Sequence, residues 1–223
     1  MSSQRFASLS TELIIIIILG ILVILPLGLI VVQSFWSAEL GYGGELTAGN
    51  YINLTSDPTI PKMLQNTVIM AIFQTSLAII FGVALAWLVA RTNIPRSGLI
   101  EKLMVVGFII PGFGTAIGWA MLGQPETGLL NILLPIEVNI YSIEGMIWVG
   151  TIAYTPIAFM MTLPMFRSMN PELEEASYVL RGSKLGTALR VTVPLAAPSI
   201  FSSAIIILIF SLEDFVIPMV LGL

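Results

Sequence analysis

The feature that most constrains this chain is a set of five apolar stretches, each long enough to cross a lipid bilayer as a helix. A hydrocarbon core of about 30 Å requires roughly 20 consecutive, mostly apolar residues in helical form. The five stretches lie at residues 13–34, 67–90, 103–123, 145–166 and 198–221. Because backbone polar groups in lipid must be satisfied inside each segment, the sequence predicts an all-α membrane protein, a polytopic helical bundle.

Composition supports a lipid environment and removes several classes of function. The 223 residues are 57% hydrophobic and 10% charged, whereas soluble domains have about 25% charged residues. The chain contains no cysteine and no histidine, which excludes disulfides, thiolate and imidazole metal sites, cysteine nucleophiles and Ser-His-Asp catalysis. The charge pattern gives no support for nucleic-acid binding, and no cofactor is expected on this chain.

The first stretch is expected to stay in the mature protein. Arg5 precedes it as in a signal peptide, but the apolar run extends from Leu13 to Val32 and no Ala-x-Ala cleavage site follows. Those lengths and flanks fit a retained membrane span better than a signal sequence.

Lys and Arg residues set the orientation, because they are retained on the cytoplasmic side during insertion. Of the nine, only Lys62 lies in residues 35–66 or 124–144, the two loops that the five spans place on one side of the membrane. The other eight lie in the N-terminal segment and in the loops on the opposite side. We therefore expect a protein of the cell membrane, with a cytoplasmic N-terminal segment at residues 1–12 and a cytoplasmic loop at 167–196. Residues 13–223 are expected to form one transmembrane domain whose fifth span runs outward. A chain ending at Leu223 is then expected to be a truncated piece, without a sixth span.

Several stretches contain Pro and Gly, which interrupt helices or allow them to pack closely. The densest group is Ile110 to Gly114, in which Pro111, Gly112 and Gly114 predict a distorted helix at a pathway or gate. Ordinary plasticity of membrane helices is the alternative, since Gly and Pro are commoner in them than in soluble helices. Further positions of this kind are Pro26, Gly28, Gly118, Pro156 and Pro164, and Gly82, Ala86 and Ala90 form a small-residue stripe for helix contact.

Glu213 and Asp214 are two carboxylates inside the fifth stretch. A carboxylate near the bilayer centre costs roughly 2.5 to 3.5 kcal/mol on insertion scales, so such groups usually face a cavity or a partner. We interpret them as pathway or gate residues. The alternative is a position near the outer interface, with water in reach.

The long loop that begins at residue 167 has the form of a docking segment. Asn170 is a suitable N-cap, Pro171 suits the first helical position, and the Glu residues that follow complement the helix N-terminus. We expect a helix to start here, with a narrow apolar stripe formed by Leu173, Ala176 and Leu180, and a bend at Gly182 and Gly186. A capped, mixed-charge helix of this kind suits a groove in a soluble partner, whereas several Glu residues argue against resting on anionic lipid.

This loop resembles the EAA motif of permease subunits in binding-protein-dependent ABC importers, in which Glu-Ala-Ala is followed after fixed intervals by Gly and by a final Leu-Pro. Glu175-Ala176-Ser177 opens the motif here, and Val191 to Pro194 closes it at the matching separation. Ser177 replaces the second Ala, and Arg181 occupies the Gly position with Gly182 one place later. The resemblance assigns ATPase docking to Glu174, Glu175, Ala176, Ser177, Arg181, Gly182 and Pro194.

The resemblance covers most of the chain. Within this family, the sequence is most similar in pattern to the iron(III)-type branch of the permeases. The stretches on which the resemblance rests include residues 86–92, Ile110 to Gly112 and Ser211 to Pro218. It implies the type I importer bundle, an extracytoplasmic solute-binding protein, a second permease half and cytoplasmic ATPase subunits that use ATP and Mg²⁺. It also implies that a helix from about Pro171 to Leu185 is the coupling helix that contacts the ATPase, and that Glu175 pairs with an Arg of the ATPase. The implied cargo is iron(III) or a related small solute such as a polyamine, thiamine or a phosphonate.

Two other functions remain open from the residues alone. A secondary transporter driven by an ion gradient would use Glu213 and Asp214 as carriers, and a membrane-anchor subunit would only recruit a soluble complex. An enzyme has the least support, because no nucleophile and base set occurs. The chain also lacks the Gly-rich loop of P-loop ATPases, so any ATP hydrolysis belongs to a separate subunit.

Overall fold

The computed structural model describes residues 2–39, 41–134, 138–179 and 182–222, with residues 2–11 as backbone only. The chain divides into two compact units, Met1–Met63 and Leu64–Leu223. The described residues form helices, with one isolated β-bridge between Trp36 and Leu46. The predicted all-α membrane fold is therefore confirmed.

Unit 1 contains the long helix α1 (Ser2–Ser34) and the short helix α2 (Gly49–Ser56). Within unit 1, the large apolar side chains of α1 from Leu13 to Val32 are 41% to 70% exposed. Pro26 lies inside α1 without interrupting it. The end of α1 is tied to α2, since the Asn50 side-chain amide donates to the carbonyls of Ser34 and Trp36 at 3.1 and 3.0 Å.

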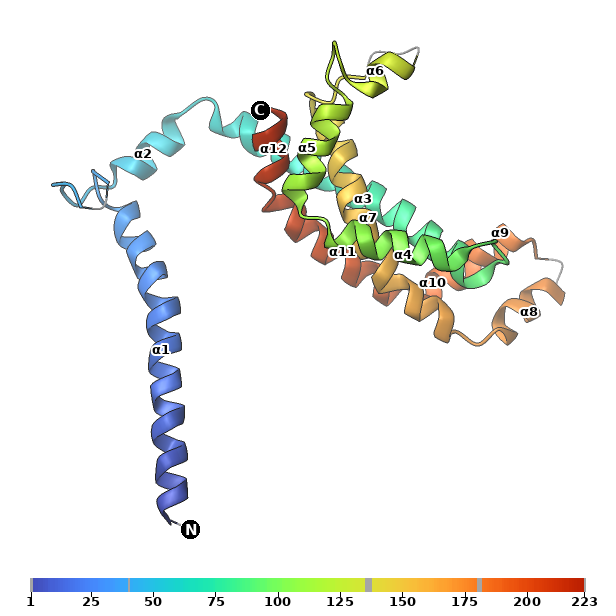
Figure 1. Cartoon of the computed structure of the whole chain (residues 1–223), viewed down its shortest axis with the longest axis horizontal. Coiled ribbons are helices and arrows are strands. Elements are labelled where there is room, and N and C mark those ends of the chain that lie inside the picture. The colour runs from blue at the N-terminus through green and yellow to red at the C-terminus, as the bar shows by residue number, and fades with distance from the viewer. Residues whose placement is uncertain (1, 40, 135–137, 180–181, 223) are drawn as a thin grey trace. The chain divides into compact units, whose positions relative to one another are not determined.

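Unit 2 is a helical bundle built around two long, unbroken helices (Figure 1). These are α3 (Ile60–Arg91), which begins in unit 1, and α7 (Ile143–Ser168). The remaining elements are α4 (Ser97–Ile109), α5 (Gly112–Leu122), α6 (Leu129–Leu133), α8 (Glu172–Val179), α9 (Lys184–Thr187), the π-helical turn η1 (Ala188–Thr192), α10 (Val193–Leu195), α11 (Ala197–Leu212) and α12 (Val216–Leu221). Within the described residues, α1, α3 and α7 are each long and apolar enough to cross a membrane. The number rises to five if each of two bent helix pairs is one span.

The stretch at 103–123 is not one straight helix. It consists of α4 and α5, which meet at an angle of 102° around Ile110 and Pro111. Pro111 lacks a backbone N–H and has the extended ψ of 141°, so it ends α4 and begins α5. The Pro and Gly group therefore interrupts this segment, as its composition predicted. In contrast, Pro156 and Pro164 lie inside a continuous α7.

The stretch at 198–221 is also broken, which corrects the expectation of a single fifth helix. Residues Lys184–Leu195 and Ala197–Leu212 form a pair bent by 71°. The helix α11 then ends at Leu212, and α12 starts at Val216. Glu213 and Asp214 therefore lie in a break between two helices and not on the face of one.

The core of unit 2 has two ends. At one end, Ala116 of α5 and Ile217 and Leu221 of α12 pack with residues of α3 and α7. At the other end, Val83 and Ala86 of α3 pack with further residues of α7 and with Ala196. The helices α3 and α7 run through both ends, whereas the short helices α5 and α12 belong only to the first.

A buried polar bridge joins three helices between these ends. The Gln74 side chain of α3 is 1% exposed, and its amide nitrogen donates to the Met146 carbonyl of α7 at 3.0 Å. Its amide oxygen accepts a short hydrogen bond from the Ser211 hydroxyl of α11. Gly150 provides the space, because a Cβ there would lie 2.3 Å from the Gln74 amide nitrogen.

Replacing Gln74 by Leu is expected to lower the stability of the bundle by about 1 to 3 kcal/mol, because two buried polar groups lose their partner. Thermal unfolding of the purified protein in detergent measures the change. The same replacement at Gln65, which is exposed on α3, is expected to stay within about 0.5 kcal/mol of the wild type. Equal unfolding temperatures for the two variants would show that the bridge contributes nothing.

Candidate functional site

The helix α8 begins where its capping residues predicted. The Asn170 side-chain oxygen accepts the backbone N–H of Glu172 at 3.1 Å, and the Pro171 carbonyl accepts those of Glu174 and Glu175 at 3.0 Å. The helix is shorter than expected. It ends at Val179 and does not continue to Leu185. Leu180 and Arg181 lie outside the described residues.

The chain turns back after α8 through a close contact at Gly182. Its backbone N–H donates to the Ser177 carbonyl at 2.9 Å. A Cβ at Gly182 would lie 2.6 Å from the Ser177 hydroxyl oxygen and 2.7 Å from its carbonyl oxygen. Ser177 also shares a hydrogen bond of 2.8 Å with the Thr187 hydroxyl. Gly182 is therefore needed for space at this bend, and Ser177 holds α8 against residues 182–196, the returning segment that leads into α11.

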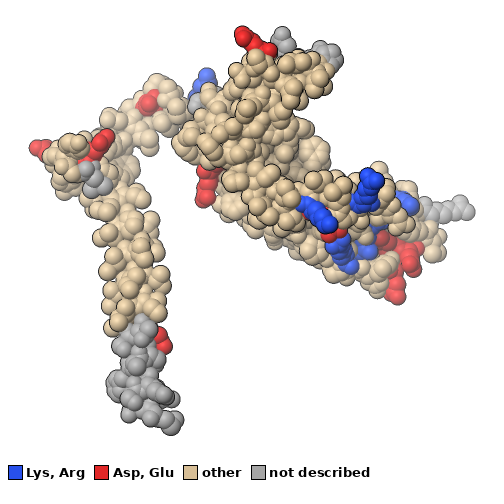
Figure 2. Space-filling model, in the orientation of Figure 1, with Lys and Arg blue, Asp and Glu red and all other residues tan. Residues whose placement is uncertain are grey.

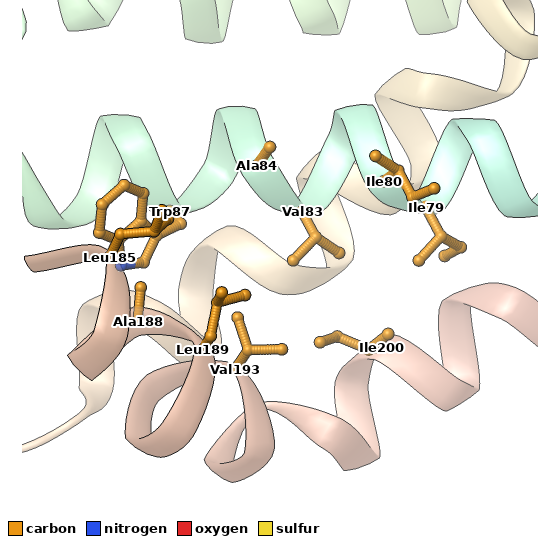
Figure 3. A pocket seen from close by; sticks show the side chains of 10 residues that line it. All are labelled: Ile79, Ile80, Val83, Ala84, Trp87, Leu185, Ala188, Leu189, Val193 and Ile200. Carbon is orange, nitrogen blue, oxygen red and sulfur yellow. The ribbon is translucent and has the colours of Figure 1, made fainter.

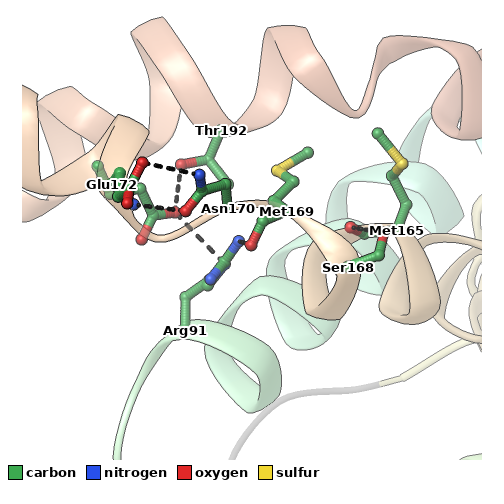
Figure 4. Close-up of polar contacts among 8 residues, drawn as sticks. Arg91, Met165, Ser168, Met169, Asn170, Glu172 and Thr192 are labelled. Carbon is green, nitrogen blue, oxygen red and sulfur yellow. Dashed lines mark hydrogen bonds and ion pairs between the residues drawn. The ribbon is translucent and has the colours of Figure 1, made fainter.

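The three acidic residues of α8 face different surroundings. Glu172 and Glu175 are exposed, together with Ala176. Glu174 is 14% exposed in its side chain and forms an ion pair with Arg91, at 3.4 Å between Nε and Oε1. The Thr192 hydroxyl donates to the same Glu174 oxygen at 2.7 Å. Figure 4 shows Arg91 and Thr192 reaching this cluster from different segments.

Basic side chains gather at the end of unit 2 that contains α8 and α9, as Figure 2 shows. Within this end, Arg167 forms two hydrogen bonds with the Glu101 carboxylate, at 2.6 and 3.0 Å. That ion pair joins the end of α7 to α4. Lys184 and Arg190 are exposed on the returning segment.

The returning segment faces α3 across an apolar groove. The groove has a volume of about 350 Å³. Figure 3 shows Trp87 of α3 opposite Leu185 and Leu189, with Val193 and Ile200 further along. Pro194 lies in the adjacent helical turn, α10, and is exposed.

The candidate gate residues lie at two breaks: Pro111 precedes α5, whose first turn contains Gly112 and Gly114, and Glu213 and Asp214 lie between α11 and α12. Pro111, Gly112 and Gly114 are exposed, and a Cβ at Gly112 would meet nothing within 4 Å. The Asp214 carboxylate accepts the backbone N–H groups of Val216 and Ile217 at 2.9 and 3.2 Å.

The other oxygen of the Asp214 carboxylate lies 3.1 Å from the Tyr154 hydroxyl, which donates to it from α7. Asp214 thus starts α12 and joins it to α7, whereas the adjacent Glu213 is exposed. A carboxylate with three donors is an anchored group, which weakens its interpretation as a mobile ion carrier.

Replacing Tyr154 by Phe removes the hydroxyl that holds Asp214. Interhelical hydrogen bonds in membranes contribute about 0.6 kcal/mol on average and at most about 1.7, so a loss in this range is expected. Thermal unfolding measures it, with the exposed Tyr42→Phe as the matched control. A variant that unfolds together with its control would contradict an anchoring role for this bond.

Comparison with known proteins identifies the family. A family model described as "Binding-protein-dependent transport system inner membrane component" matches residues 78–223. The chain belongs to this family. The match includes α8, the returning segment and both helix breaks, so the resemblance to permease subunits of such importers is confirmed.

Individual relatives agree with this placement. The chain is 26% identical to a putative ferric transport system permease protein of Haemophilus influenzae, over 100% of this chain and 35% of the relative. It is 28% identical to the ferric transport system permease protein of Actinobacillus pleuropneumoniae, over 93% of this chain and 30% of the relative. The chain therefore spans about a third of the length of these relatives.

The fold also matches a solved membrane structure. A bacterial ABC transporter involved in the import of the polysaccharide alginate superposes with a TM-score of 0.73 over 99% of this chain and 82% of the other, at 14% sequence identity. The agreement at low identity shows a shared fold.

Among the described residues, no group of three His, Cys, Asp or Glu side chains could hold a metal ion.

Proposed function

We propose that this chain is a permease component of an ATP-driven importer, in which it forms part of the transmembrane substrate pathway and couples to a cytoplasmic ATPase through α8. The observation that most supports this function is the exposed face of α8. Glu175 and Ala176 of the EAA-like motif are exposed there, on a short capped helix next to a basic end of the bundle, while Glu174 and Ser177 hold the helix from behind.

The charge distribution supports the orientation that this function needs. The Lys and Arg side chains of unit 2 that Figure 2 shows in blue lie at the end that contains α8, and basic residues mark the cytoplasmic side of membrane proteins. The docking face then lies in the cytoplasm, together with the N-terminus. The opposite end, with α5, α6 and α12, then faces the extracytoplasmic solute-binding protein.

The proposed partners follow from the family. They are ATPase subunits that bind ATP and Mg²⁺, a solute-binding protein and a second permease half, either fused or separate. The proposed cargo is iron(III) or a related small solute, which rests on the two ferric permease relatives. The proposed pathway or gate residues are Pro111, Gly112 and Gly114 at one break and Glu213 with Asp214 at the other.

Reconstitution of the full protein with its ATPase and binding protein in liposomes tests the proposal. Iron(III) uptake is expected only when ATP and the loaded binding protein are both present. Uptake driven by a proton or sodium gradient without ATP would support a secondary transporter. Recruitment of the ATPase without any uptake would support a membrane-anchor subunit.

A further inference from the structure

Two adjacent glutamates of α8 point to different environments, and the difference separates their roles. The side chain of Glu174 is 14% exposed, whereas Glu175 is exposed. Consecutive helical residues are turned by about 100°, so only one of the two can face the bundle. The residue that faces inward is not available to an ATPase that approaches from outside.

The Glu174 carboxylate connects three segments that are far apart in the sequence. One of its oxygens accepts the Thr192 hydroxyl at 2.7 Å and lies 3.4 Å from Arg91 Nε at the end of α3. Arg91 in turn donates from Nη2 to the Met169 carbonyl at 3.0 Å. The cluster therefore joins α8 to α3, to η1 and to the connection between α7 and α8 (Figure 4).

The Arg91–Glu174 ion pair is more buried than the Arg167–Glu101 ion pair at the same end of the bundle. The side chains of Arg91 and Glu174 are 11% and 14% exposed, whereas those of Arg167 and Glu101 are 51% and 29% exposed. Water and salt weaken exposed pairs, but a mostly buried charge depends strongly on its partner. Losing either member of the Arg91 pair therefore leaves an uncompensated charge next to the membrane.

Apolar packing between α3 and the returning segment is incomplete. An open groove of about 350 Å³ lies between them (Figure 3). Trp87 lines this groove one turn before Arg91 on α3. The polar cluster at the end of this groove therefore adds a specific link between α8 and α3 to the apolar contact of Ala196 with Val83 and Ala86.

Thr192 links α8 to the segment that leads into the next membrane helix, α11. It is the last residue of η1, a π-helical turn, and such turns are rare and often occur at functional sites. The chain then bends by 71° into α11. Glu174 therefore contacts α3 through Arg91, and it contacts the segment that leads into α11 through Thr192.

We propose that Glu174 is a positioning residue that fixes the coupling helix α8 to the membrane helices through Arg91 and Thr192, while Glu175 serves docking. This inference rests on the proposed function of α8 as the ATPase contact. In this arrangement, Glu174 transmits motion of α8 and does not bind the ATPase.

The test compares Glu174→Gln with wild type in the complex of full protein, ATPase and binding protein in liposomes. Gln keeps an oxygen for the Thr192 hydroxyl but removes the charge that pairs with Arg91. We expect the ATPase to co-purify in the wild-type amount, and the cargo transported per ATP hydrolysed to fall about tenfold, within the range usual for coupling between sites. Glu101→Gln, which breaks the exposed pair with Arg167, is the matched control and is expected to keep the wild-type ratio.

Arg91 variants provide a second measurement. Arg91→Gln is expected to lower the same ratio, and Arg91→Lys, which keeps the charge, is expected to restore most of it. The amount of folded permease is measured for each variant by size-exclusion chromatography of the purified complex, and the ratios are compared at equal amounts, so that poor folding of one variant is not mistaken for the effect.

Three results would overturn the inference. A wild-type ratio in Glu174→Gln would remove the transmitting role. Loss of ATPase co-purification in that variant would make Glu174 a docking residue. Failure of the wild-type protein itself to retain any ATPase would overturn the proposed function, and this inference with it.

Discussion

Replacing Gly82 by Ala is expected to destabilise the bundle by about 1 to 3 kcal/mol, the usual cost of adding volume to a packed core. A Cβ at this position would lie 2.5 Å from the Cβ of Ala158, 2.8 Å from the Thr155 carbonyl oxygen and 2.9 Å from the Phe159 amide nitrogen. Two of these three atoms belong to the α7 backbone, which cannot move aside without shifting the helix. Small residues at such crossings let membrane helices approach closely.

Gly118→Ala on α5 is the matched control for this prediction. A Cβ at Gly118 would meet nothing within 4 Å, and Ala favours a helix over Gly by about 1 kcal/mol. The two variants are therefore expected to change the unfolding temperature in opposite directions. A Gly82→Ala protein that unfolds at or above the wild-type temperature would show that α3 and α7 can separate at no cost.

Replacing Glu175 by Arg is expected to abolish co-purification of the ATPase and to reduce transport by at least tenfold. The proposed partner of Glu175 is an Arg of the ATPase, and a charge-assisted pair of this kind becomes a repulsion when its acidic member is reversed. Because Glu175 is exposed on α8, the permease itself is expected to fold normally. Affinity capture of the tagged permease followed by an assay of bound ATPase measures the loss.

Glu126→Arg is the control for the change in net charge. Glu126 is exposed in the loop after α5, at the end of unit 2 that faces away from α8 in the proposed orientation. It is expected to retain the ATPase in full. If Glu175→Arg bound and coupled the ATPase as well as this control does, docking would have to be assigned to another face of the loop.

Local chemistry was enough to predict where helices start and where they break. Asn170 and Pro171 predicted the start of α8, and the Pro111 group predicted an interruption that the structure places between α4 and α5. These features depend on backbone donors and on φ and ψ preferences, which are properties of a few consecutive residues. The small-residue stripe at Gly82 and Ala86 was equally informative, because both positions are buried against other helices.

Contacts between distant segments could not be predicted in this way. Arg91 was used as an orienting charge and as part of the resemblance at residues 86–92, and Gln74 gave no signal, although both connect elements more than sixty residues apart. Asp214 was expected on a continuous helix, whereas Tyr154 from α7 and the start of α12 determine its place. Which of Glu174 and Glu175 faces inward also depends on how α8 is rotated against α3, and a single sequence does not specify that rotation.

The break at Pro111 has a consequence for what can surround it. In an unbroken helix the carbonyl of Gly107 would accept the backbone N–H of residue 111, and proline has none. Hydrocarbon offers no replacement, and an unsatisfied backbone group there costs several kcal/mol. Ile110 is 47% exposed in the isolated chain and Pro111 is exposed beside it. A polar group that this break leaves unpaired would find its partner in water or in a neighbouring protein segment, and not in lipid tails.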